Sequence, residues 1–332
     1  MRNASLSGGR WCARPDFSPA SLQGCTLHAE TRMWREKNCY ADIWISVLQC
    51  AGVEPHACLG HVLSADFVGD QWTFFKPSHD DLYDLYGIEV QELTVWRPLL
   101  EHAVEHLAAG RLISTESDAW WLPDTQGTDY RRQHTKTTIV LNEIDLGERR
   151  LGYFHNTGYH FLEGEDFDRT FNLVDAVDPA FMPLFAELVK LDRLRRRPVG
   201  ELRSFARARL RSHVERRPLS NPFRGFRDRF VTELPHLQER GLDHYHAWAF
   251  ANTRQAGAAF DVAAQHLRWL DGEPRPGLAH AAADFERIAA LMKSFILKGA
   301  RLVRSGKPVE ETEMLNEAAA CWDSGMQALV SL

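Results

Sequence analysis

The sequence predicts an α+β domain over residues 1–170 followed by an all-helical domain over residues 171–332. Three observations support this fold class. Before about residue 168, short β-branched or aromatic runs alternate with amphipathic helical stretches, whereas after residue 171 one helical pattern follows another. The length of 332 residues also suffices for one large domain or two ordinary ones.

The composition is that of a globular protein with a substantial core, because 44% of residues are hydrophobic and 25% are charged. A net charge of −6 argues against a nucleic-acid-binding protein. No apolar run approaches the roughly 20 residues that a membrane span requires. The first residues lack the apolar segment of a signal peptide. We therefore expect a cytoplasmic protein that binds neither membrane nor nucleic acid.

Six cysteines are too few for a disulfide framework in a chain of this length, so we expect free thiols in a reducing compartment. His56, Cys58 and His61 have the spacing of metal ligands, but no second cluster completes a set of four. The sequence therefore predicts no metal site.

Residues 39–52 predict a buried helix, with Asn38 as its N-cap and Gly52 as its left-handed C-terminal cap. One face carries apolar residues at helical spacing, namely Tyr40, Ile43, Trp44, Val47 and Leu48. Cys39 occupies the first helical position, where free N–H groups and the helix dipole favour the nucleophilic thiolate.

The elements between this helix and residue 121 are predicted from short local patterns. Residues 1–28 form an irregular lead-in. Further along, apolar periodicity bounded by Gly, Ser and Pro predicts helices over 53–65, 78–86 and 98–109, a hairpin over 66–77, and strands over 89–96 and 112–121.

The best hairpin pairs residues 135–144 with residues 150–156, after a polar loop over 124–133. If Asp145 pairs with Glu148, position 138 lies opposite His155, and His134 and His155 then share a face. A bulge would instead place position 138 opposite Asn156. The sequence leaves this register open.

The second domain is predicted to contain six helices separated by Pro and Gly. They cover residues 179–197, 199–217, 224–240, 245–270, 277–303 and 310–330.

A cysteine at the start of a helix, a histidine that opens a strand and a polar residue on the next strand form a papain-like arrangement. Here these residues are Cys39, His134 and Asn156. The thiolate attacks an acyl carbonyl, the imidazole handles the proton, and the third residue orients the imidazole. Asn156 is preferred because its side-chain oxygen accepts an imidazole N–H, and His155 is the alternative. Backbone N–H groups at the helix start would hold the oxyanion.

The order of these features resembles the butirosin-biosynthesis acyltransferase family, papain-like enzymes with a helical C-terminal domain. The matching pieces are Asn38-Cys39, Leu59-Gly60, residues 117–123, His134 with its hairpin, and residues 256–270. The match is closer to a bacterial branch associated with amino-acid:carrier-protein ligases. The resemblance implies transfer of an acyl or aminoacyl group from the phosphopantetheine thioester of a carrier protein to an amine, with no bound cofactor.

In two respects the sequence departs from this pattern. Papain-like proteases place a Gln before the Cys as an oxyanion donor, whereas the corresponding stretch here reads Thr31-Arg-Met-Trp-Arg-Glu-Lys37. Asn38 could substitute for that donor, or the backbone could act alone. The third member is also not the Asp of many relatives, and Asp118 is the nearest acidic alternative.

A basic segment over residues 190–217 carries eleven Lys or Arg against three acidic residues. An ordinary solvated helix face is the usual meaning of such a run. Docking of an acidic carrier protein is the functional interpretation, with Arg203, Arg207 and Arg211 as its contacts. Two function classes stay open: a cysteine acyltransferase, or a papain-like protein that is a peptidase or amidase, or that only binds a partner.

Overall fold

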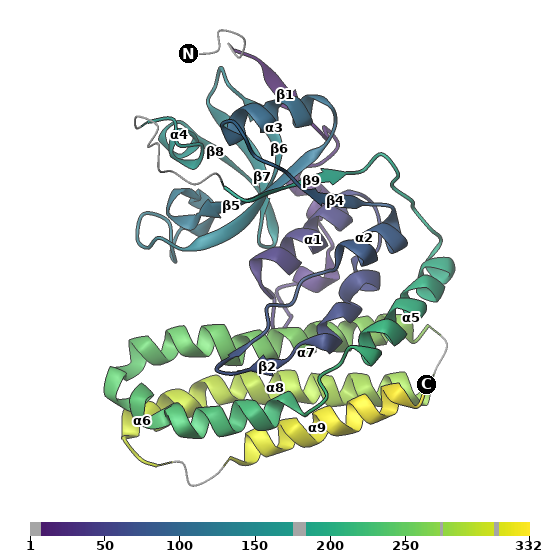
Figure 1. Ribbon diagram of the computed structural model, residues 1–332, viewed down its shortest axis with the longest axis vertical. Coiled ribbons are helices and arrows are strands. Elements are labelled where there is room, and N and C mark those ends of the chain that lie inside the picture. The colour runs from purple at the N-terminus through teal and green to yellow at the C-terminus, as the bar shows by residue number, and fades with distance from the viewer. Residues whose placement is uncertain (1–7, 175–183, 273–274, 309–311) are drawn as a thin grey trace. The chain divides into compact units, whose positions relative to one another are not determined.

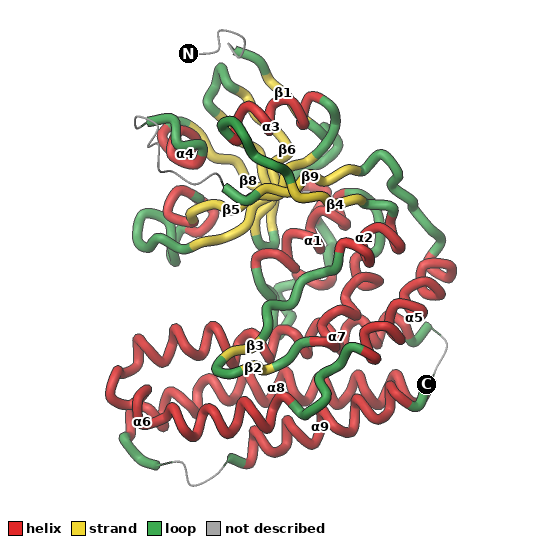
Figure 2. The backbone as a smooth tube through the Cα atoms, viewed as in Figure 1, coloured by secondary structure: helices red, strands yellow, loops and turns green. Residues whose placement is uncertain are grey.

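The structure is a computed structural model that describes residues 8–174, 184–272, 275–308 and 312–332. It is mixed α/β, with an antiparallel sheet and a helical C-terminal region (Figures 1 and 2). Two compact units share the chain. The first comprises Met1–Thr26, Cys39–Pro55 and His79–Arg197, and the second comprises Leu27–Asn38, His56–Ser78 and Pro198–Leu332. The division into domains at residue 170 stays a prediction, and the compact units themselves are interleaved along the sequence.

An antiparallel sheet forms the centre of the first unit, with strand order β4-β9-β5-β6-β7-β8 and β1 paired to β6. The strands are β1 (Arg10–Cys12), β4 (Glu89–Glu92), β5 (Leu112–Asp118), β6 (Lys136–Asp145), β7 (Arg150–His155), β8 (Gly158–Glu163) and β9 (Ala186–Lys190). Figure 2 shows these strands in yellow, crossing in one twisted layer. The predicted hairpin is confirmed as β6 and β7.

Strand β9 overturns one prediction. Residues 186–190 lie within the helix expected over residues 179–197, but they form an extended strand between β4 and β5. Residues 179–183 lie outside the described part of the chain. The sequence Ala-Glu-Leu-Val-Lys favours a helix by local propensity, and pairing on both edges overrides that preference.

The register of β6 against β7 resolves the alternative that the sequence left open. Val140 pairs with Phe154, and the ladder shifts at a bulge between Leu141 and Glu143. Continuing the ladder places Thr138 opposite Asn156. Asn142, at the bulge, is buried and bonds through its side chain to both backbone groups of Arg14, at 3.0 and 3.1 Å, which hold the extra residue in place.

Because strand side chains alternate, this register assigns residues to two faces of the sheet. Face A carries Ser114, Glu116, Asp118, Lys136, Thr138, Val140, Phe154 and Glu187. Face B carries Thr115, Ser117, Thr137, Ile139, Leu141, Tyr153 and His155.

Helix α1 (Cys39–Cys50) packs against β6, β7 and β8, and its residues from Tyr40 to Leu48 are all buried. It lies on face A, because the hydroxyl of Tyr40 donates to Glu187 at 3.1 Å. The predicted cap at Gly52 is confirmed by a φ of +69°, which a residue with a Cβ rarely adopts. The other helices are α2 (His79–Tyr86), α3 (Leu99–Ala108) and α4 (Glu165–Thr170), with short 3₁₀ turns η1 (Pro19–Leu22), η4 (Ala119–Trp121) and η5 (Pro123–Thr125).

The second unit is mainly helical. Its elements are the 3₁₀ helix η3 (Pro55–Ser64), the hairpin β2 (Phe67–Val68) and β3 (Gln71–Trp72), α5 (Val199–Glu215), α6 (Pro222–Ala249), the π-helical turn η6 (Phe250–Arg254), α7 (Gln255–Leu270), α8 (Pro276–Ser305) and α9 (Glu313–Val330). A further 3₁₀ turn, η2 (Thr26–His28), falls where the sequence passes from one unit to the other. The helices expected from residue 199 onwards and the hairpin over 66–77 are confirmed. Helix α6 is kinked at Gly241, whose φ is +81°.

Aromatic rings fill the core of the second unit. The ring centres of Trp72 and Phe223 are 4.9 Å apart, and those of Phe230 and Phe295 are also 4.9 Å apart. Trp34, which precedes α1 in sequence, belongs to this core and donates its indole N–H to the carbonyl of Ala289 at 3.2 Å. None of the helices in the described residues combines the length and apolar character needed to cross a bilayer.

Candidate active site

Cys39 is the first residue of α1, as the sequence predicts, and its side chain is partly exposed. Within the described part of the chain its thiol makes no hydrogen bond, so it is not paired with His134 in this structure. Cys50, at the other end of the same helix, donates weakly to the carbonyl of Ser18. Burial raises the pKa of the Cys50 thiol to about 12, so this second thiol stays protonated and unreactive.

His134 lies just before β6 and forms a pair with Asp118 at the end of β5. Its Nδ1 lies 2.6 Å from Oδ2 of Asp118, and its ring stacks on Trp120 with the ring centres 4.5 Å apart. Oδ1 of Asp118 accepts the backbone N–H of Trp120 at 3.0 Å. The carboxylate is therefore fixed through both oxygens, and the imidazole is held in place by a bond and a stack. The imidazole is 68% exposed, so a substrate could reach its free edge.

Asn156 does not join His134. It follows β7 in a tight turn with a φ of +46°, and its backbone carbonyl accepts the hydroxyl of Ser46 at 3.4 Å. Asn38, in the second unit, donates its side-chain amide to the carbonyl of Phe75 at 2.9 Å. The structure thus brings Asp118 to His134, while it gives Asn156 and Asn38 other bonds.

His155 is buried on face B and belongs to a different cluster. Its Nδ1 lies 2.6 Å from Asp124, and its Nε2 lies 2.8 Å from the hydroxyl of Thr137. Tyr153 also donates to Asp124, at 2.5 Å. Burial alone would raise the pKa of Asp124, but the bonds from His155 and Tyr153 and the nearby charges hold it below its usual range. Burial, followed by the Asp124 charge, raises the pKa of Tyr153.

Sequence reasoning missed this cluster, which we call the Asp124 cluster. Asp124 lies in a stretch interpreted as a plain polar loop, its partners His155 and Tyr153 come from β7, and Thr137 on β6 bonds to His155. Only the bulge register, which the sequence leaves open, would have indicated that His155 and Thr137 share a face.

A second cluster that the sequence did not indicate lies on face A beside α1. Glu187 is buried and accepts the hydroxyl of Ser114 at 3.2 Å as well as that of Tyr40, and His79 lies 3.2 Å from its other oxygen. Burial, followed by the charge of Glu187, raises the pKa of Tyr40. The error over β9 hid this cluster, because a helix over residues 179–197 would not place Glu187 next to Ser114.

Comparison with protein families decides where the chain belongs. The DUF1839 N-terminal domain matches residues 23–191, and the DUF1839 C-terminal domain matches residues 200–331. The chain belongs to the DUF1839 family. No curated protein matches it significantly. The gap between the two matched ranges contains Arg197, where the first compact unit ends.

In this DUF1839 protein, two of the three arginines predicted to dock a carrier also stabilise a helix end. Arg203 donates to the carbonyl of Trp269, and Arg207 to that of Leu270, each at 2.9 Å. These carbonyls close α7, where cationic side chains complement the helix dipole. Arg211 is exposed, and its guanidinium makes no hydrogen bond or ion pair within the described residues. It is therefore the arginine best placed to meet a partner.

Two backbone carbonyls of the predicted metal-like segment, those of Cys58 and His56, lie against histidine rings. Nδ1 of His61 lies 2.8 Å from the carbonyl of Cys58, and Nδ1 of His266 lies 2.7 Å from that of His56. Burial lowers the pKa of His266 to about 4, so this imidazole is neutral near pH 7. Among the described residues, no three side chains of the ligand-forming types are grouped to hold a metal ion.

Proposed function

We propose that this protein is a cysteine-dependent acyltransferase of papain-like type, with Cys39 as nucleophile, His134 as base and Asp118 as the residue that orients His134. The observation that carries the proposal is the 2.6 Å pair between His134 and Asp118, on the sheet face that α1 covers. Asp118 replaces Asn156 as the preferred third member, because a carboxylate that accepts the imidazole N–H fixes its tautomer and stabilises the imidazolium.

The geometry of α1 supports the pairing of Cys39 with His134. Residues 39 and 46 are seven apart and share one side of the helix. Ser46 reaches the turn at Asn156, which lies at the end of the sheet toward which β5 ends and β6 begins. Cys39 lies two helical turns, about 10 Å along the axis, before Ser46 on this same side of α1, and its approach to His134 is part of the proposal.

The proposed reaction has two stages. The Cys39 thiolate attacks the carbonyl carbon of a thioester, the bond to the phosphopantetheine sulfur breaks, and His134 returns a proton to that sulfur. The amine acceptor then attacks the Cys39 thioester and loses a proton to His134, and the Cys39 thiolate leaves as the amide forms. Backbone N–H groups at the start of α1 would stabilise each oxyanion.

The proposed partner is an acidic carrier protein, since its charge would complement the basic segment over residues 190–217. Arg203, Arg207 and Arg211 remain the proposed contacts. Because Arg203 and Arg207 also hold the end of α7, the cleaner test is Arg211→Glu alone. We expect this change to weaken carrier binding at low salt, where exposed charges interact most strongly, and to leave attack on a small thioester unchanged. Equal carrier affinity at low salt would contradict the docking surface.

Intact-protein mass spectrometry tests the proposed function. The protein is mixed with a carrier that bears an acyl or aminoacyl thioester, and we expect a covalent acyl adduct that is absent in Cys39→Ala. Cys50→Ala is the matched control on the same helix and should keep the adduct. If Cys39→Ala keeps the adduct, or if the wild type leaves every loaded carrier intact, the proposal is wrong. Cleavage of a peptide library that depends on Cys39 would instead indicate a peptidase.

A further inference from the structure

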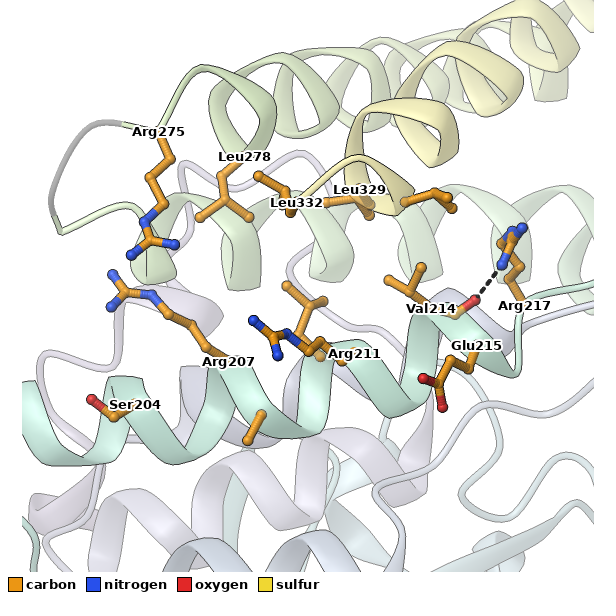
Figure 3. A pocket seen from close by; sticks show the side chains of 13 residues that line it. Ser204, Arg207, Arg211, Val214, Glu215, Arg217, Arg275, Leu278, Leu329 and Leu332 are labelled. Atoms are coloured by element: carbon orange, nitrogen blue, oxygen red, sulfur yellow. Dashed lines mark hydrogen bonds between the residues drawn. The ribbon is translucent and has the colours of Figure 1, made fainter.

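A cavity of about 550 Å³ lies within the second unit, between α5, the start of α8 and the end of α9 (Figure 3). This volume falls in the range of small-molecule sites, which are typically apolar clefts with a few polar groups. The cavity belongs to neither the Cys39 site nor the Asp124 cluster. Neither of those sites therefore accounts for the residues that line it.

The wall of this cavity is apolar. Leu210 and Val214 come from α5, Leu278 from α8 and Leu329 from α9, and each of these side chains is more than nine-tenths buried. In Figure 3 Val214, Leu278 and Leu329 project into the space between α5 and the other two helices. A wall of this kind, running along a helix, suits an unbranched hydrocarbon chain.

One end of the cavity is cationic. Figure 3 shows the guanidinium groups of Arg207 and Arg275 pointing toward each other from opposite walls, with Arg211 next along α5. Within the described residues, no acidic side chain pairs with Arg207, Arg211 or Arg275. Asp271 is nearby, but it accepts the backbone N–H of Arg275 at 2.7 Å. Two guanidinium groups that face each other repel, and an anion between them would remove that repulsion.

The other end of the cavity is different. Glu215 lies there, and Arg217 donates to the backbone carbonyl of Val214 at 2.9 Å. The charge of the lining is therefore polarised, because three guanidinium groups lie at the first end, whereas the charges of Glu215 and Arg217 offset each other at the other end. A ligand that matches this arrangement has its negative group at one end only.

We infer that this cavity binds an amphipathic monoanion of the fatty-acid class, with its carboxylate between Arg207 and Arg275 and its chain along Val214, Leu278 and Leu329. Arginine recognises carboxylates through two parallel N–H bonds, which suits two guanidinium groups that converge from separate helices. Fatty-acid binding here does not require acyl transfer, because the cavity contains neither Cys39 nor His134 nor Asp118, although it shares Arg207 and Arg211 with the proposed carrier-docking surface.

Isothermal titration calorimetry of the full chain with dodecanoate, below its micelle concentration, tests the inference. We expect saturable binding with one site per chain, and an affinity that rises about fourfold per methylene from hexanoate upwards until the cavity is full. Arg275→Gln should weaken dodecanoate binding about tenfold, since it removes a charge-assisted bond. Ala208→Trp should abolish binding, because Ala208 is exposed on α5 and a ring there would fill the cavity.

The matched control for Arg275→Gln is Arg301→Gln, an exposed α8 arginine outside the cavity, which should leave affinity unchanged. Cys39→Ala should bind dodecanoate as the wild type does, whatever becomes of the proposed transferase. Equal affinity for dodecanol and dodecanoate would overturn the assignment of the anionic end. Binding that survives Ala208→Trp, with the midpoint of thermal unfolding unchanged, would overturn the site itself.

Discussion

Replacing Asp124 with alanine should destabilise the protein strongly, because it removes the acceptor of two buried donors. His155 lies 2.6 Å and Tyr153 2.5 Å from its carboxylate, and the side chains of Asp124 and His155 are 5% and 2% exposed. Each lost bond to a charged acceptor costs about 1.5–3 kcal/mol when the donor stays buried. Two such bonds are lost, so we expect Asp124→Ala to cost about 3–6 kcal/mol.

Urea denaturation measures this effect through the shift of the unfolding midpoint at constant slope. The matched control is Asp323→Ala, which breaks a 2.7 Å pair with Arg224 on the surface. Exposed pairs contribute about 0–1 kcal/mol, so the control should change the free energy of unfolding little. A loss below about 1 kcal/mol for Asp124→Ala would refute the reasoning, because it would mean that water replaces the carboxylate at no cost.

The same pair makes a prediction about pH. The pKa of Asp124 is lowered in the folded state, so its contribution is complete above its ordinary value of 3.8 and is lost as the pH falls further through the folded value. The gap in the free energy of unfolding between wild type and Asp124→Ala should therefore narrow as the pH falls below 4. A gap that stays the same from pH 4 down to pH 2 would show that ionisation of Asp124 contributes nothing to the stability of the cluster.

Three further predictions concern the site and the core. Asp118→Asn should lower the rate of acyl transfer by up to about ten-thousandfold in a thioester assay, because His134 loses its carboxylate partner, while the midpoint of thermal unfolding stays unchanged. Gly257→Ala should destabilise by about 1–3 kcal/mol in urea, because its Cβ would lie 2.3 Å from the ring of Trp34; Gly200→Ala, which meets no atom within 4 Å, should stabilise slightly. Peptide mapping after iodoacetamide treatment at pH 8 should find Cys50 unmodified in the folded protein, since its pKa is raised to about 12.

Local patterns suffice to predict much of the fold. The β-branched run of β6, the apolar stripe of α1 and the glycines that end the helices are signals within a few residues of the elements they define. These elements were predicted at close to their observed bounds. The buried helices of the second unit follow the same rule, and Gly241 is the point where α6 departs from one continuous helix.

Two of the features that were missed, strand β9 and the bulge in β6, depend on distant partners. β9 is a strand because β4 and β5 supply its hydrogen bonds, not because of its composition. The bulge in β6 likewise depends on a distant contact. Asn142 is the extra residue of the bulge, and its side chain bonds to the backbone of Arg14 near the N-terminus. The residues of β9 carry no local signal of its pairing, and the residues of β6 carry no local signal of the contact to Arg14. The sequence could therefore suggest His134 and Asp118 by residue type, but it could not choose between Asn156 and His155.

The structure offers two His–Asp pairs, one on each face of the sheet, and exposure separates their roles. Both pairs have Nδ1 to Oδ2 distances of 2.6 Å, so geometry alone does not distinguish them. His155 uses its other nitrogen to bond Thr137 and is buried, so no edge of its ring is left for a substrate. His134 is 68% exposed and lies on the face that α1 covers. A general base needs a ring nitrogen within reach of the substrate, so His134 alone of the two fits the chemistry proposed for Cys39, and His155 belongs to the framework that holds β6 and β7 together.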